Sequence, residues 1–273
     1  MRSCMNILYL TVLAGLGATS VVTPARASHE PSSATPALTA SFPRQVSERP
    51  DVATTDPDAL YAQREDLDKA REAVEIWQAR VRRDPSDFES TWQIARAMYW
   101  LGSHGPKDGR RADLETGMEA ARQAIALDSD RPEGHFWLAA TMGTLAEQSG
   151  KLTGLRYRGR IKEALETVLR LDPAFQQGSA DRVLGRWYYR VPGLFGGSKT
   201  KSEEHLRRSL KYNPNSTATL FFLAETLVAL DRKDEARRVL ETLLDAPDDP
   251  DWAPEDREFK AQARELLTDL VKG

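Results

Sequence analysis

Residues 212–240 read YNPNSTATLFFLAETLVALDRKDEARRVL, and this stretch decides the fold. After the Asn213-Pro214 turn, a helical pattern places Ala224, beside Leu223, three residues before Leu227, and in the next segment Ala236 stands four residues before Leu240. A small residue lets two helix backbones approach, and a large residue fills the space beside it. The stretch therefore predicts two helices packed against each other.

The same pattern recurs along the chain from about residue 58 onward. Apolar residues return every three or four positions without the alternation typical of strands. Turn signals separate about ten helices, and the last, about Pro254 to Val271, is expected to cap the array. The small residue of the first helix recurs as Ala95, Ala139, Gly185 and Ala224. The sequence predicts an all-α superhelix of helical hairpins over residues 57–273.

These residues resemble the tetratricopeptide repeat, a helix-turn-helix unit of about 34 residues. The resemblance covers about residues 66–246, in four to five units. Extra residues around 103–111 and 191–198 lengthen two of the turns.

Several longer stretches resemble a narrower group, the T-component (TatT) proteins of TRAP transporters and the related regulator-of-microtubule-dynamics proteins. They are Trp92–Gly102, Pro132–Leu138, Leu184–Tyr189 and Pro192–Gly197. This resemblance, over most of residues 70–271, implies a periplasmic, non-catalytic protein that binds a ligand or a transporter component. Leu16 stands where the lipoprotein form of the T-component carries its lipidated cysteine, so no lipid anchor is expected.

The N-terminal residues have the pattern of a secretory signal peptide. Arg2 precedes an apolar run from Ile7 to Val22, and Ala25-Arg26-Ala27 provides a cleavage site before Ser28. A membrane anchor is the alternative, but glycine, serine and threonine dilute the run. We therefore expect cleavage after Ala27 and a periplasmic or secreted protein. Residues 28–56 are rich in Pro, Ser, Thr and Ala and are expected to form a flexible tether or, alternatively, an extended arm packed on the domain.

Composition excludes several classes of function. The net charge is −3 and becomes 36 − 41 = −5 without residues 1–27, so nucleic-acid binding is not expected. Cys4 is the only cysteine, which excludes disulfides and a cysteine-ligated zinc site. Residues 193–200 approach the phosphate-loop motif, but Ser198 replaces a required glycine and a helix, not a strand, precedes them. No catalytic motif, cofactor site or metal site is predicted. The basic run 156–162 is interpreted as a solvated or inter-subunit patch.

The first helix of each unit lines the concave surface of such arrays, and this is where binding is expected. The candidate ligand-binding residues are Trp92, Arg96, Tyr99, Arg182, Arg186 and Tyr189, with Phe195 in the Pro192–Gly197 loop. Arginine forks and rigid rings suit a small anionic or amphipathic ligand, or a peptide. The alternative is that these aromatics fill gaps between units, and this is favoured for Trp137 and Tyr188. Loss of Arg186 is expected to weaken binding without unfolding the array.

Two functions remain open at this point. One is a non-catalytic ligand-binding accessory protein of an uptake system, with the Pro192–Gly197 loop acting as a lid or only as a turn. The other is a protein-interaction scaffold in cell-envelope assembly. An enzyme is not expected, because no set of clustered titratable residues is visible. The sequence leaves the ligand and the oligomeric state open.

Overall fold

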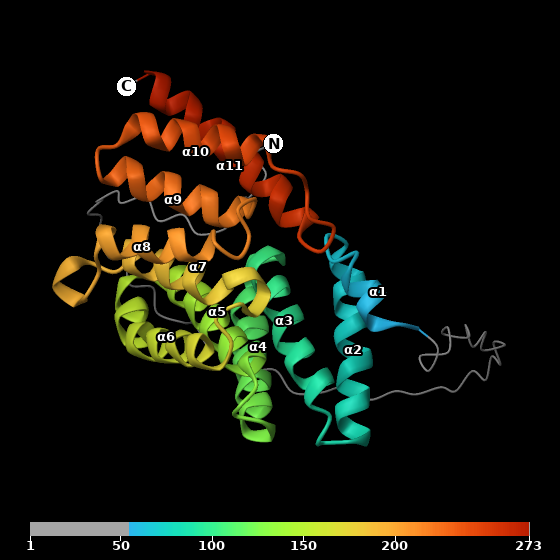
Figure 1. The fold of residues 1–273 in the computed structure, drawn as a ribbon. Coiled ribbons are helices and arrows are strands. Elements are labelled where there is room, and N and C mark those ends of the chain that lie inside the picture. Colours follow the sequence, from blue (N-terminus) through green and yellow to red (C-terminus); the bar gives the residue numbers. More distant parts are fainter. Residues whose placement is uncertain (1–54, 273) are drawn as a thin grey trace, which may run out of the picture. The chain divides into compact units, whose positions relative to one another are not determined.

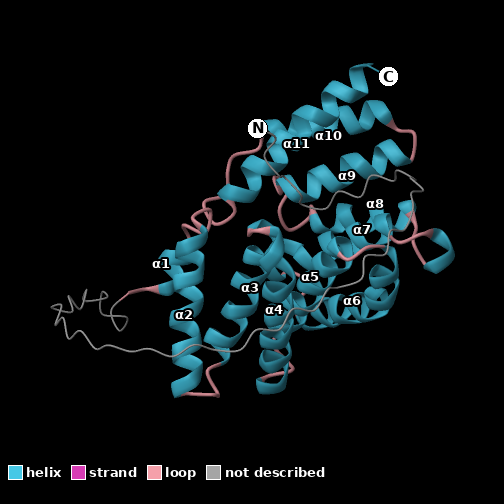
Figure 2. Cartoon of the chain, turned by 180° about the vertical axis from the view of Figure 1, so that it is seen from behind, coloured by secondary structure: helices cyan, strands magenta, loops and turns pink. Residues whose placement is uncertain are grey.

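The computed structural model describes residues 55–272, which form eleven α-helices and one short 3-10 turn, η1 (Figure 1). In the part of the chain so described there is no β-strand (Figure 2), as the all-α prediction requires. The predicted signal peptide (1–27) and nearly all of the predicted tether (28–56) lie outside the described residues. The helices are α1 Pro57–Tyr61, α2 Leu67–Arg83, α3 Phe88–His104, α4 Lys107–Leu127, α5 Pro132–Gln148, α6 Lys151–Leu171, α7 Phe175–Arg190, α8 Lys199–Ser209, α9 Thr217–Ala229, α10 Lys233–Asp245 and α11 Ala253–Lys272, with η1 at Gly193–Phe195.

The helices pack as successive hairpins. Four pairs, α3 with α4, α5 with α6, α7 with α8 and α9 with α10, pack tightly, and the first helix of each pair also contacts that of the next. Helix α11 packs against α9 and α10 and caps the array, as predicted (Figure 1). The count differs slightly from the predicted ten, because α1 is a separate five-residue helix. None of the described helices has the length and apolar character that crossing a bilayer demands.

The small residues identified in the sequence lie at the helix-helix contacts. Ala95, Ala139 and Ala224 are fully buried. A Cβ at Gly185 would lie 2.5 Å from Cγ of Leu206, so only glycine lets α7 and α8 approach this closely. Side-chain hydrogen bonds cap the N-termini of several helices. The Asp87 side chain, for example, accepts from the backbone N–H of Ser90 at 2.9 Å.

Buried apolar residues form two clusters within this unit. The first runs from Tyr61 to Tyr188, through helices α1 to α7. The second runs from Leu206 to Leu270, through α8 to α11. Polar contacts between α7 and the following helices connect the two clusters, among them the hydrogen bond between Asp181 and His205 at 2.7 Å. The fold therefore has a polar junction at α7.

The C-terminal helix also reaches back to the N-terminal end of the array. Arg64, in the turn after α1, is 5% exposed and pairs with Glu255 of α11 at 2.5 Å. The guanidinium of Arg64 also donates to the carbonyl of Asp251 at 2.8 Å. The backbone carbonyl of Arg64 accepts from Nε1 of Trp100 at 2.7 Å. These contacts bring the start of α11 beside α1 and α3. Glu255, at the start of α11, also lines the cavity between α7, α9 and α11.

Candidate functional site

The predicted residues Trp92 and Arg96 lie together on α3, close to α1. The guanidinium of Arg96 lies 4.2 Å from the ring centre of Tyr61 and 5.3 Å from that of Trp92. It also pairs with Asp58 at 3.5 Å. Burial lowers the pKa of Arg96 below its ordinary value. Arg96 is therefore already surrounded by aromatic rings and a carboxylate from its own chain.

Tyr99 lies one helical turn further along α3, in the middle of the inner surface. Its ring centre is 5.5 Å from that of Trp137 on α5. Burial raises the pKa of its hydroxyl to about 12, and the charges of Glu255 and Glu147 add to the rise. Trp137 and Tyr188 are buried, as the packing interpretation requires.

Arg186 differs from its predicted exposed position. It is 5% exposed and pairs with Glu225 of α9 at 2.5 Å. Its guanidinium also lies 4.6 Å from the ring centre of Phe222 and 5.3 Å from that of Tyr189. A buried ion pair at the polar junction holds neighbouring units together, because removing one partner strands a charge. The expectation that loss of Arg186 leaves the array stable is therefore not supported.

Tyr189 and Phe195 face different surroundings. Tyr189 lies beneath Lys199, whose ammonium is 3.5 Å from the ring centre and also donates to the Tyr189 carbonyl. Phe195 contacts Arg158 of α6, at 5.5 Å from guanidinium to ring centre. Helix α6 is the second helix of its unit, so the η1 turn packs toward the outer layer. The contacts seen within the described residues do not join Phe195 to Trp92 or Arg96.

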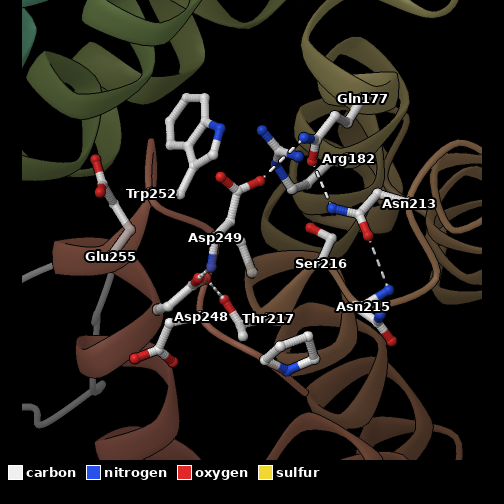
Figure 3. A pocket seen from close by; sticks show the side chains of 13 residues that line it. Gln177, Arg182, Asn213, Asn215, Ser216, Thr217, Asp248, Asp249, Trp252 and Glu255 are labelled. Atoms are coloured by element: carbon white, nitrogen blue, oxygen red, sulfur yellow. Dashed lines mark hydrogen bonds between the residues drawn. The ribbon is translucent and has the colours of Figure 1, made fainter.

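A cavity of about 230 Å³ lies where three segments meet (Figure 3). The segments are the beginning of α7, the turn and first residues of α9, and the loop that leads into α11. Its polar and charged lining residues are Gln177, Arg182, Asn213, Asn215, Ser216, Thr217, Asp248, Asp249, Glu255 and Asp256, with Trp252 as the aromatic wall. Arg182 is the one predicted ligand-binding residue that lines this cavity.

Arg182 is a half-buried cation without an ion pair in the described part of the chain. Figure 3 shows its guanidinium reaching between Gln177 and Asp249. Burial lowers the pKa of Arg182 to about 10, although the charges of Tyr99, Glu255 and Asp256 act in the opposite direction. Desolvation has the largest effect on this pKa, and no ion pair within the described residues offsets it.

The carboxylates around the cavity fall into two groups. Glu255 is paired with Arg64, and Asp248 is paired with Lys260 at 2.5 Å. Asp249 and Asp256 have hydrogen-bond donors but no cation. Gln177 Nε2 and the backbone N–H of Asp251 donate to Asp249 at 3.1 and 3.0 Å, and the Thr217 hydroxyl and the backbone N–H of Asp249 donate to Asp256 at 2.5 and 2.7 Å. The cavity thus presents one unpaired cation and two carboxylates without a cation. This arrangement suits a ligand that carries both charges.

The rim of the cavity contains unusual backbone. Gln176, Gln177 and Gly178 have positive φ values of 43°, 59° and 76°, which non-glycine residues seldom adopt. The Gln177 side chain bridges the rim, because its amide donates to Asp249 and its oxygen accepts from Asn213 Nδ2 at 2.5 Å. Such strain costs about 1–3 kcal/mol per residue and gathers at functional sites.

Sequence reasoning missed most of this cavity. The acidic loop before α11 reads as a charged surface turn, and nothing local marks its proximity to Arg182. Trp252 beside Asp249 and Asp251, just before a helix, was the available signal. Within the described residues, no group of three or more His, Cys, Asp or Glu side chains is placed to hold a metal.

Comparisons with known proteins define first the class of fold and then the family. A tetratricopeptide-repeat model matches residues 201–254. The structure of TTC0263, a thermophilic tetratricopeptide-repeat protein from Thermus thermophilus, is similar with a TM-score of 0.59 and 20% identity, over 78% of this chain and 97% of that one. A MamA structure is similar with a TM-score of 0.45 and 16% identity, over 73% of this chain and 95% of that chain. The chain has the tetratricopeptide-repeat fold.

The family follows from the N-terminal half of the array. The family model described as Regulator of microtubule dynamics protein 1-3 matches residues 54–195, just over half of the chain. The chain therefore belongs to this family. No curated protein matches it significantly.

Proposed function

We propose that this chain is a non-catalytic, exported tetratricopeptide-repeat protein whose cavity at Arg182 binds a small zwitterionic ligand or the end of a peptide. One observation carries the proposal: Arg182 lines a cavity of about 230 Å³ without an ion pair in the described residues, opposite carboxylates that also lack a cation. A cavity of this volume accommodates an amino acid or the end of a peptide more readily than part of a folded protein. This narrows the ligand expected from the sequence, an anionic or amphipathic molecule, to one that also carries an amine.

The chemistry of the lining supports this assignment. A guanidinium binds a carboxylate through two parallel hydrogen bonds, and few other side chains do so as well. An ammonium group would lie against Asp249 and Asp256, with the Trp252 ring providing apolar and cation-π contact. Loss of one charge-assisted contact costs about 1.5–3 kcal/mol, roughly ten- to a hundredfold in affinity.

Ligand carry-over and thermal shift provide the test. Native mass spectrometry of the purified chain would show a bound small molecule, and free amino acids and short peptides would be screened for stabilisation. Arg182→Gln should abolish both signals. Arg170→Gln, on the exposed face of α6, is the matched control and should retain them. Equal stabilisation of both variants, or no amine-and-carboxylate compound among the ligands, would contradict the proposal.

Export and a transporter partner form the second part of the proposal. Their support is the signal-peptide pattern of residues 1–27 and the resemblance to the T-component of TRAP transporters. N-terminal sequencing of the protein from its native host should begin at Ser28. A membrane-bound form that retains Met1 would contradict export, and a failure to co-purify with transporter subunits would remove that partner.

A protein-interaction scaffold in envelope assembly is the second candidate function. The repeat fold favours it, because tetratricopeptide-repeat proteins commonly bind proteins or peptides. Most inner charges outside the cavity are also already paired, as with Arg96 and Asp58 or Arg190 and Glu147. Cross-linking in cells separates the two functions. A scaffold should keep its protein partners in the Arg182→Gln variant, whereas a peptide receptor should lose them.

A further inference from the structure

A basic surface with protruding apolar side chains lies on the outer layer of helices. None of its residues lines the cavity at Arg182. It is formed by Leu152 and residues 154–162 at the start of α6, and by residues 191–202 around η1. These 22 positions contain six Lys and Arg residues and no Asp or Glu, in a chain that has 41 acidic against 38 basic residues. The contact of Arg158 with Phe195 joins the two segments, and Trp187 Nε1 donates to the Arg158 carbonyl at 3.0 Å.

The apolar side chains on this surface are unusually exposed. Leu152 is 85% exposed, Leu194 is 89% exposed and Phe195 is 39% exposed. Leu194 is at the tip of the η1 turn, which projects from the edge of the ribbon next to α8 (Figure 1). A Cβ added at Gly154 or Gly193 would meet no atom within 4 Å, so the space beside these two glycines is open. Isolated leucines in water stabilise nothing in the chain itself.

The cations around these leucines are available for an external partner. Arg156 and Arg160 are exposed and form no ion pair in the described part of the chain. Arg158 is partly buried and donates to the Leu155 carbonyl at 2.5 Å. Lys201 is exposed as well. Lys162 is partly engaged, because it pairs with Glu166 at 3.4 Å.

We propose that this surface docks the protein on an anionic phospholipid bilayer, with Leu152 and Leu194 entering the interfacial region and Arg156 and Arg160 contacting lipid phosphates. Two features favour a bilayer over an acidic protein. The apolar groups are single protruding side chains rather than a flat contiguous patch, and the segments that form the surface contain no Asp or Glu of their own. The uniform positive charge complements a surface of phosphates, since each Lys or Arg near such a surface strengthens binding about fivefold.

Vesicle co-sedimentation tests the proposal, with the full chain and with the chain that begins at Ser28 and retains every described helix. Vesicles of phosphatidylethanolamine and phosphatidylglycerol are compared with vesicles of phosphatidylcholine alone. Both chains should bind the anionic vesicles preferentially, and added salt should weaken binding. Binding by the full chain alone would assign the affinity to residues 7–22 and overturn the proposal.

Variants with matched controls locate the surface. Arg156→Ser with Arg160→Ser should weaken binding roughly 25-fold, and Leu152→Ser with Leu194→Ser roughly tenfold or more. Arg82→Ser with Arg83→Ser, exposed cations on α2, and Val271→Ser, a 78% exposed apolar residue on α11, should bind like the parent chain. All these positions are exposed, so melting temperatures should stay unchanged.

Three results of these vesicle and variant experiments would also overturn the proposal. They are equal loss in patch and control variants, no preference for anionic vesicles, and a dimer in light scattering that dissociates with Leu152→Ser and Leu194→Ser. Salt-sensitive capture of an acidic protein with no vesicle binding would equally refute a bilayer partner.

Discussion

Gly185 and Arg186 are adjacent in sequence, yet they stabilise the junction between the two apolar clusters in different ways. Gly185 allows the close approach of α7 to Leu206, and Arg186 joins α7 to α9 through Glu225. The first contribution is steric and the second is electrostatic. The same helical turn therefore carries the two contacts that the junction depends on.

Substitutions at these residues should both destabilise, but with different signatures. Gly185→Leu should cost about 1–3 kcal/mol or more, because its side chain overlaps Leu206. Arg186→Met should cost about 3–5 kcal/mol by stranding the buried Glu225, whereas Arg186→Met with Glu225→Met should recover much of it. Denaturant unfolding measures each value. An Arg186→Met variant as stable as the parent would show that the pair with Glu225 does not hold the units together, as the binding role expected from the sequence requires.

Glu147 of α5 should make the stability of the protein depend on pH. Burial raises the pKa of Glu147 to about 7, although Arg186 and Arg190 lower it and Glu225 raises it further. The folded chain thus holds a proton that the unfolded chain releases near pH 4.5. Stability from this group is complete below about pH 4.5 and is lost as the pH rises toward 7.

The Glu147→Gln variant isolates this contribution. Its free energy of unfolding, relative to the parent chain, should rise by on the order of 2–3 kcal/mol between pH 4.5 and pH 8. Glu163→Gln, an exposed carboxylate on α6, is the control and should show no such difference. Parallel pH profiles for parent and Glu147→Gln would show that Glu147 titrates at its ordinary pKa.

At the scale of elements, α11 is both the cap of the array and one wall of the cavity. Arg64 fixes it, through Glu255 and the carbonyl of Asp251. Burial raises the pKa of Glu255, against the lowering effect of Arg64, so the carboxylate depends on this guanidinium. The position of α11, and with it the shape of the cavity, should depend on this one contact.

Arg64→Met should therefore loosen α11 selectively. We expect a loss of about 3 kcal/mol and faster amide exchange in residues 253–260, because Glu255 is left without its partner. Arg257→Met removes an exposed pair with Glu65 and should change stability by less than about 1 kcal/mol. Unchanged exchange in α11 after Arg64→Met would show that apolar contacts with α9 and α10 are enough to hold it.

The helix pairs were predictable from the sequence because their signals are local. Ala95 or Ala224 with a large neighbour marks a helix-helix contact within a few residues, and α11 begins with an acidic first turn after Pro254. The cavity was less predictable, because Gln177 and Asp249 are 72 residues apart in sequence and meet through the return of α11. Arg182 could be predicted as a binding residue from its position in the repeat. Arg186 has a similar position, but it forms an ion pair with Glu225 that the sequence alone does not show.

At the scale of the whole described unit, two apolar clusters share one fold through few connections. A linear repeat array can unfold in parts when the contacts between neighbouring repeats are weak. Here the polar junction around Arg186 joins the clusters in the middle, and the Arg64 contact joins them at the ends of the array. We expect these two links together to make unfolding cooperative.

Two spectroscopic probes can test this cooperativity, because the tryptophans are unevenly distributed. Five of the six pack in or against the first cluster, namely Trp77, Trp92, Trp100, Trp137 and Trp187, so fluorescence reports mainly on it. Far-UV circular dichroism reports on all helices.

Urea transitions from the two probes should coincide in the parent chain and in Arg257→Met. They should separate when Arg64→Met is combined with Arg186→Met, since both polar links are then weakened. Coincident transitions in that double variant would show that the apolar contacts of α7 with α8 and α9 alone couple the two clusters.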